Sequence, residues 1–167
     1  LVNLLAHEGE LCIPRLKGMF GFAALDRFNQ RLILARDALG IKPVWYSFLD
    51  DGTLIAASEG KALLEHPGLK ARLNKAGLWD YLSFTVTPAP STLFEDVFKV
   101  PAGTYGIYDL KARHDIQWTN YFQLGEILNR PRLKMDDVEA ETELTRLLVE
   151  ATERRMISDV PFGAYLS

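Results

Sequence analysis

Four segments with the composition of β-strands follow one another near the start of this sequence, with no helix between them. They span residues 18–26, 31–37, 44–48 and 53–58. A turn at residues 27–30 joins the first two, and an Asp-Gly pair at residues 51–52 supplies the positive φ angles that a tight turn needs between the last two. The sequence therefore predicts two successive β-hairpins. The first segment is continuously apolar and carries glycines where a neighbour packs closely, which is typical of a buried strand.

Helices surround these hairpins, so the predicted fold class is α+β. Residues 1–9 are predicted to form the end of a helix that Gly9 closes. Further helices are predicted at residues 59–65 and 74–84, and Asn74 is the expected N-cap of the second. One more strand is predicted at residues 105–109.

A change in pattern predicts a boundary between two domains. Residues 111–134 are polar and irregular, and residues 129–132 are the best candidate for a linker. A helix follows, with Asp136 and Glu139 as a capping box and an apolar face formed by Val138, Leu144, Leu147, Leu148 and Ala151. An apolar strand is expected at its end. We predict a first domain at residues 1–110, a linker at 111–135 and the start of a second domain at 136–167.

Both ends of the sequence lead us to expect a piece of a larger protein. Residues 1–6 open in the middle of a helical pattern, and residues 159–167 break off inside the expected apolar strand. A natural domain seldom ends inside a buried strand, because the next backbone groups would lack hydrogen-bond partners.

Composition argues against several classes of partner. The formal net charge is -3, and no segment clusters lysine and arginine with aromatic residues, so we expect no binding to nucleic acid. The apolar stretches are too short to span a membrane. A single cysteine cannot form an internal disulfide, which favours a reducing, cytoplasmic location.

The residue pattern identifies no catalytic group and no metal site. Cys12 lies between two apolar residues without a histidine nearby in sequence, which is typical of a buried structural thiol. The histidines match no metal-ligand spacing: His7, His66 and His114. The acidic residues near the start and in the second hairpin are interpreted as solvated charges: Glu8, Glu10, Asp50 and Asp51.

Residues 36–43 combine a charged pair, a glycine and a Lys-Pro step at the junction between two strands. We interpret this segment as a structural corner that an interaction between Arg36 and Asp37 holds together. The next transition from strand to helix is interpreted as a helix cap formed by Ser58 and Glu59, with Lys61 close by. A functional role for either segment would need a partner surface.

Three motifs stand out in order: KGMFGFA at residues 17–23, LARDALGIKPVWY at 34–46 and ASEGKAL at 57–63. Together they resemble the class II glutamine amidotransferase domain of glutamine-hydrolysing asparagine synthetases. TPAPSTLF at 87–94 and KVPAG at 99–103 resemble the region that joins the two domains of that family. SDVPFGAYLS at 158–167 resembles the entry to its synthetase domain, so the resemblance covers nearly the whole chain.

The resemblance implies part of an Ntn-hydrolase αββα sandwich, followed by the first helix and strand of an α/β ATP-pyrophosphatase domain. In that family an N-terminal cysteine hydrolyses glutamine, and ammonia passes through an internal tunnel to an acyl-adenylate made from aspartate and MgATP. The family's cysteine and glutamine-holding residues precede Leu1 in order, and only the first serine of its pyrophosphate loop is matched. We therefore expect no catalytic residue in this chain, which by itself should be inactive.

Four positions match functional positions of the family. Leu166 and Ser167 match the strand end that contacts ATP. Met19 and Ile41 match positions that line the ammonia tunnel, where an apolar wall keeps out bulk water. For the parent enzyme, the resemblance implies ATP and Mg²⁺ as cofactors and glutamine and aspartate as substrates, and it is compatible with a homodimer.

Two alternatives stay open at this point. The amide acceptor could be another carboxylate, on a sugar uronate or a peptide, because the acceptor residues lie downstream of Ser167 in the family. Alternatively, the chain could be a non-catalytic Ntn-like module that binds a partner through an open sheet edge.

Overall fold

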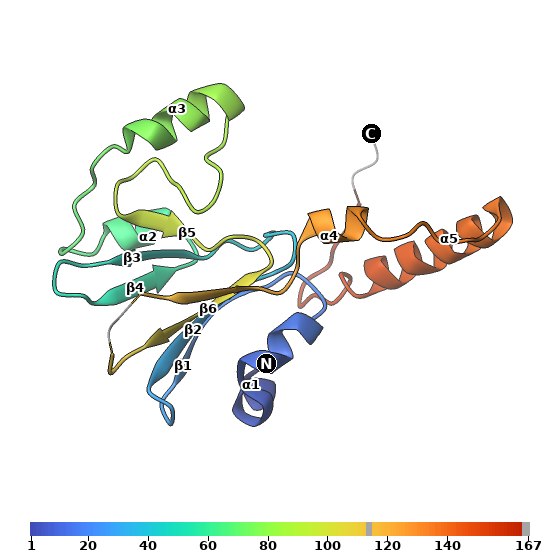
Figure 1. Ribbon diagram of the computed structural model, residues 1–167, viewed down its shortest axis with the longest axis horizontal. Helices are drawn as coiled ribbons and strands as arrows, with labels where there is room; N and C mark the ends of the chain where they lie inside the picture. The colour runs from blue at the N-terminus through green and yellow to red at the C-terminus, as the bar shows by residue number, and fades with distance from the viewer. Residues whose placement is uncertain (113–114, 165–167) are drawn as a thin grey trace. The chain divides into compact units, whose positions relative to one another are not determined.

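The computed structural model describes residues 1–112 and 115–164 and divides into two compact units, Leu1–Leu124 and Gly125–Ser167 (Figure 1). Both sheets belong to the first unit, and the second unit is helical where it is regular. Among the helices of the described residues, none has the length and apolar character to cross a membrane.

The first hairpin lies in a four-stranded antiparallel sheet with the order β1-β2-β6-β7. Its strands are β1 (Gly21–Asp26), β2 (Arg31–Arg36), β6 (Thr104–Asp109) and β7 (Gln117–Asn120). The register pairs Gly21 with Arg36 and Asp26 with Arg31, which confirms the predicted hairpin.

The second hairpin lies in a separate three-stranded antiparallel sheet with the order β4-β3-β5. Its strands are β3 (Trp45–Phe48), β4 (Leu54–Ala57) and β5 (Val97–Lys99). Gly52, in the turn between β3 and β4, has a φ of 80°, which confirms the predicted role of the Asp-Gly pair. The two hairpins therefore follow each other in sequence but belong to different sheets.

Alternating side chains along β2 contribute to two hydrophobic cores. Leu32 and Leu34 contribute to a core shared with the second sheet, whose buried members also include Val44, Tyr46, Val100, Tyr108 and Ile116. Ile33 and Ala35 contribute to a second core, together with Cys12, Ile13 and Tyr105. Because successive side chains of a strand point to opposite faces, β2 is covered on both faces.

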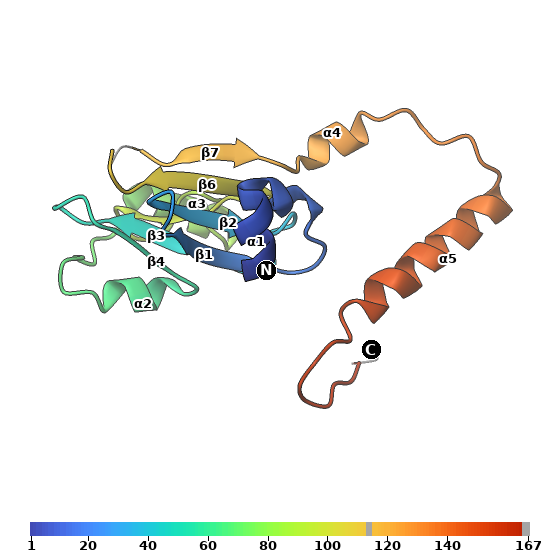
Figure 2. The same cartoon turned by 90° about the horizontal axis from the view of Figure 1, so that it is seen from below.

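Helical segments cover the outer faces of the two sheets. Helix α1 (Val2–Glu8) and the 3₁₀ helix η1 (Gly9–Arg15) lie over the first sheet, where Leu5 packs against the core that contains Cys12. Helix α2 (Gly60–Leu64) contacts β3 and β4 of the second sheet (Figure 2). The first unit is thus layered as helix, sheet, sheet and helix.

The predicted cap of the third helix is confirmed. Helix α3 (Lys75–Phe84) begins after Asn74, whose side-chain oxygen accepts hydrogen bonds from the backbone N–H groups of Ala76 and Gly77, each at 3.1 Å. These bonds satisfy two of the N–H groups that a helix start leaves without intrahelical partners.

Two parts of the first unit differ from expectation. β1 is not a buried strand: its residues alternate between exposed and half-buried, and Leu25 is 56% exposed. Among the described strands, β1 lies at the edge of its sheet and pairs only with β2. Residues 111–134 are not uniformly irregular: they contain β7, which pairs with β6, and helix α4 (Leu124–Leu128).

In the second unit, helix α5 (Asp137–Glu153) begins with the predicted capping box between Asp136 and Glu139. The leucines of its predicted apolar face are exposed by 47–59%. Residues 160–164 form no strand, so the expected terminal strand is wrong over that stretch. Leu166 and Ser167 lie outside the described residues.

Candidate functional site

The corner between β2 and β3 is built around the buried carboxylate of Asp37, which is 2% exposed. Its Oδ1 accepts hydrogen bonds from the backbone N–H groups of Leu39 at 3.2 Å and Ile41 at 2.9 Å. Its Oδ2 accepts from the N–H groups of Phe20 at 3.2 Å and Lys42 at 2.9 Å. A carboxylate offers about four acceptor positions, so these bonds occupy its capacity and leave Asp37 poorly suited to act as a general base.

Arg36 holds the same loop by donating hydrogen bonds from its guanidinium group to backbone carbonyl groups. Its Nε donates to the carbonyl of Lys42 at 3.0 Å, its Nη2 to that of Gly40 at 2.6 Å and its Nη1 to that of Val100 at 2.8 Å. The predicted structural corner is confirmed, but not its predicted cause. In the described structure Arg36 and Asp37 each bond to backbone groups of the loop instead of forming an ion pair with each other.

Gly40 and Gly103 let other segments approach this corner closely. Gly40 has a φ of 68°, and a Cβ there would lie 3.0 Å from the Cβ of Ala102 and from the guanidinium carbon of Arg36. The N–H of Gly103 donates to the carbonyl of Asp37 at 2.9 Å. The Tyr121 hydroxyl donates to the carbonyl of Arg36 at 2.7 Å, so the segment after β7 also reaches this corner.

The electrostatics of the corner follow from these bonds. Burial acts to raise the pKa of Asp37, but four backbone N–H donors outweigh burial and hold it below its ordinary value. Burial, followed by the nearby charge of Asp37, raises the pKa of Tyr121 to about 12. The Asp37 carboxylate is therefore a fixed negative charge at neutral pH, and the Tyr121 hydroxyl keeps its proton.

The two positions expected to line an ammonia tunnel both belong to segments that Asp37 binds. Met19 immediately precedes Phe20, one of the four donors, and Ile41 is another donor. Their side chains are 43% and 54% exposed, respectively, so the first unit by itself leaves both partly open.

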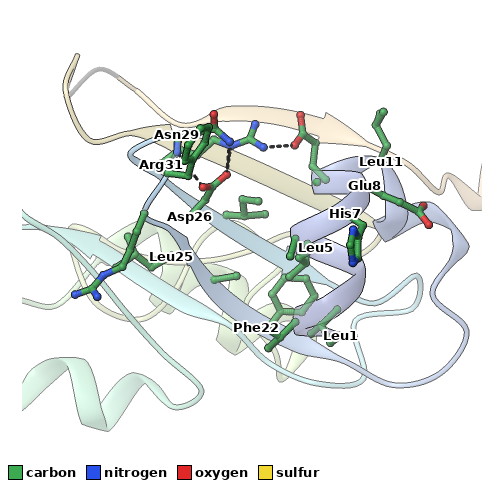
Figure 3. A pocket seen from close by; sticks show the side chains of 18 of the residues that line it. Leu1, Leu5, His7, Glu8, Leu11, Phe22, Leu25, Asp26, Asn29 and Arg31 are labelled. Atoms are coloured by element: carbon green, nitrogen blue, oxygen red, sulfur yellow. Dashed lines mark hydrogen bonds and ion pairs between the residues drawn. The ribbon is translucent and has the colours of Figure 1, made fainter.

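A separate pocket of about 810 Å³ lies between α1, η1 and the first hairpin (Figure 3). Apolar side chains from the helix and β1 line it, among them Leu5 and Phe22. At its rim Arg31 forms ion pairs with Glu10 at 2.8 Å and Asp26 at 3.0 Å. Hydrogen bonds from Asn29, first from its backbone, and from Arg31 lower the pKa of Asp26 to about 2. None of residues 36–43 lines this pocket, so it is distinct from the Asp37 corner.

The remaining candidates have structural explanations. Cys12 is 1% exposed, which confirms a buried thiol, and burial followed by the charge of Glu8 raises its pKa. Glu10 is not a solvated charge, because its side chain is only 23% exposed and is paired with Arg31. The predicted cap before α2 is wrong: Glu59 occupies the N-cap position without a side-chain cap bond and pairs with Lys61 instead.

Sequence reasoning missed the Arg31 cluster and the contact of Tyr121 with the corner. Asp26 and Arg31 flank the first turn, so their pairing across a hairpin could have been anticipated. The partners Glu10 and Tyr121 come from distant segments and left no local signal. Among the described residues, no group of three His, Cys, Asp or Glu side chains could hold a metal ion.

Comparison with known proteins places these features in a family. Residues 1–122 match the model of the glutamine amidotransferase domain. The whole chain is 31% identical to the putative asparagine synthetase (glutamine-hydrolyzing) 2 of Methanocaldococcus jannaschii and covers 32% of its length. Over 96% of the chain, identity to asparagine synthetase (glutamine-hydrolyzing) 1 of Bacillus subtilis is 31%, covering 24% of that protein.

A third relative carries a different name. The whole chain is 33% identical to the amidase chry2 of Gibberella zeae and covers 24% of its length. The chain thus spans no more than about a third of the length of these three relatives. The match over residues 1–122 shows that this chain belongs to the glutamine amidotransferase domain family.

Proposed function

We propose that this chain is part of a larger glutamine-dependent ligase of the asparagine synthetase type. It would supply the C-terminal part of the glutamine amidotransferase domain and the start of the synthetase domain. The observation that carries this proposal is the similarity to two glutamine-hydrolysing asparagine synthetases, which extends over 96–100% of the chain and therefore beyond the amidotransferase match.

The finer fold assignment is part of the same proposal. The layering of helix, sheet, sheet and helix in the first unit supports an Ntn-hydrolase αββα sandwich. Helix α5, with its capping box, supports the first helix of an ATP-pyrophosphatase domain. The following strand gains no support from residues 160–164.

The proposed reaction transfers the amide nitrogen of glutamine to aspartate. Ammonia released from glutamine would pass through a tunnel to an acyl-adenylate formed from aspartate and ATP with Mg²⁺, with Leu166 and Ser167 contacting ATP. Met19 and Ile41 would form part of the apolar lining of that tunnel. Uncharged ammonia passes through an apolar tunnel more readily than the ammonium ion does, because burying a charge costs more free energy. We also propose a cytoplasmic location and allow for a homodimer.

The test uses the full-length protein that carries this chain. It is incubated with amide-labelled glutamine, aspartate and MgATP, and glutamate, pyrophosphate and labelled asparagine are measured. We expect all three products from the full-length protein and none from the 167-residue chain alone. This chain matches only the first serine of the family's pyrophosphate loop, and its one cysteine, Cys12, is buried. Glutamate release without any amide product would contradict the ligase proposal, and no glutamate at all would favour a non-catalytic module.

A second acceptor class has one observation in its favour. The amidase from Gibberella zeae is 33% identical to this chain and carries a name other than asparagine synthetase, so similarity to this chain does not by itself establish aspartate as the acceptor. The same assay therefore includes a sugar uronate and a peptide carboxylate in place of aspartate. Labelled amide on one of these, with none on aspartate, would assign the protein to the second class.

A further inference from the structure

The two candidate tunnel positions, Met19 and Ile41, lie 22 residues apart in sequence, but the carboxylate of Asp37 binds the backbone of both segments that carry them. Met19 belongs to the segment that enters β1, and Ile41 belongs to the loop that enters β3. Both segments lie outside the strands at the points where they donate to Asp37. The position of each apolar side chain relative to the other therefore depends on a buried carboxylate.

The bonds of Asp37 are divided between the two segments. Oδ2 joins the N–H of Phe20 to that of Lys42, so one oxygen bridges the two segments directly. Oδ1 fixes the turn within the loop through the N–H groups of Leu39 and Ile41. A second link runs through the backbone, since the N–H of Asp37 donates to the carbonyl of Phe20 at 2.8 Å.

An amide could not replace this carboxylate without loss. An asparagine side chain has one acceptor oxygen and one NH₂ group, which only donates. At position 37 the NH₂ group would face two backbone N–H donors on one side of the side chain. Depending on which way the amide is turned, either the bridge between Phe20 and Lys42 or the turn bonds to Leu39 and Ile41 would be lost. The side chain would then no longer fix both the link between the two segments and the shape of the loop.

We propose that Asp37 is a positioning residue that sets the geometry of the ammonia passage by fixing Met19 and Ile41 relative to each other. This inference rests on the proposed function. Asp37 takes part in no bond making, because its acceptor positions are occupied by backbone donors. Its effect is on the transfer of ammonia between two reactions, and not on either reaction alone.

The experiment compares wild-type full-length protein with D37N, and with D50N as a matched control. Asp50 is an exposed carboxylate in the β3–β4 turn. Three rates are measured: glutamate release from glutamine, amide formation from added ammonia, and amide formation from glutamine. We expect D37N to lower the amide formed per glutamate by at least about threefold, while the rate with added ammonia stays close to wild type. D50N should match wild type in all three.

A second measurement remains informative if D37N fails to fold. Hydrogen exchange of wild-type protein, followed by mass spectrometry of peptides that cover residues 17–21 and 38–43, reports whether these amides are protected although they lie outside strands. We expect protection in both peptides. In folded D37N, protection should fall in at least one of these two peptides but not in peptides from β2 and β6.

The outcomes separate this inference from the proposed function. Unchanged coupling in folded D37N would overturn the inference and leave the ligase assignment intact. Unprotected amides in both wild-type peptides would also overturn it. If wild-type protein formed no amide from either glutamine or ammonia, the proposed function would fail, and the role of Asp37 in ammonia transfer would fail with it.

Discussion

At the scale of single residues, the corner at Asp37 shows why a charged pair in sequence does not reveal its partners. Adjacent residues in an extended strand point to opposite faces, so Arg36 and Asp37 are poorly placed to pair with each other. Each side chain instead meets loop backbone, Asp37 through N–H groups and Arg36 through carbonyls. The sequence pattern identified the right residues, but the contact with Phe20 depends on a segment 17 positions away.

The first prediction concerns how this carboxylate affects stability as pH changes. The folded-state pKa of Asp37 is lowered, so its contribution is present above the unfolded-state pKa of about 3.9 and is lost as pH falls through the lower folded value. D37N should therefore be less stable than wild type near neutral pH, by about 2 kcal/mol. This difference should begin to shrink below about pH 4 and should be lost once the pH falls below the folded-state pKa of Asp37, where the wild-type side chain is also neutral.

Urea unfolding of wild type, D37N and the control D50N between neutral and acidic pH measures this effect. D50N should follow the wild-type curve, because Asp50 is exposed and lies away from the corner. A stability difference between wild type and D37N that stayed constant across the whole pH range would show that the charge of Asp37 does not contribute.

At the scale of elements, the sequence predicted those features that depend on local chemistry. The two hairpins, the Asn74 cap and the Asp136–Glu139 capping box all follow from residues within a few positions of one another. The edge position of β1 and the pairing of β7 depend on which strands become neighbours, and hydrophobic pattern does not encode that. The tunnel candidates came from family resemblance alone, and their link through Asp37 required the structure.

Helix α3 supplies a prediction in which tertiary contact reverses a local rule. Replacing glycine with alanine inside a helix usually stabilises it by about 0.5–1 kcal/mol. At Gly77, however, a Cβ would lie 2.0 Å from the carbonyl oxygen of Thr92, which is backbone and cannot simply rotate away. We expect G77A to destabilise the protein by at least about 2 kcal/mol.

The matched control is Gly125 in α4, where a Cβ would meet no atom within 4 Å. G125A should be neutral or stabilising by up to about 1 kcal/mol. Urea unfolding of both variants provides the comparison. Equal effects at the two positions would mean that the loop carrying Thr92 moves away from α3 at little cost.

At the scale of the whole molecule, the stabilising contacts are unevenly divided. Both hydrophobic cores lie within Leu1–Leu124, where the sheets bury side chains from residues as distant as Cys12 and Ile116. Among its described residues, the second unit has only helices and irregular segments, and α5, its longest helix, has no buried residue. Its stability is therefore expected to depend on helix capping and on side-chain pairs along α5, such as Arg146 with Glu143 and Glu150.

This division predicts where a protease cuts the 167-residue chain first. Residues 129–136 are exposed and form no helix or strand, so they fit the extended conformation that a protease active site requires. Trypsin should cut after Arg132 and Lys134, and after Arg154 and Arg155 at the end of α5, before it cuts the first unit, and should leave a resistant fragment that contains both sheets. Arg130 should resist because a proline follows it. The masses of the fragments over time identify the sites.

Variants distinguish exposure of the backbone from exposure of the side chain. R132Q combined with K134Q should delay the cut within residues 129–136, whereas K61Q should leave its timing unchanged. The Lys61 side chain is 81% exposed, but its backbone belongs to α2, which packs on β3 and β4. If trypsin cut at Lys61 before it cut within residues 129–136, α2 would be unfolding locally more readily than residues 129–136 adopt an extended conformation. The packing of α2 on the second sheet would then contribute little to the stability of the first unit.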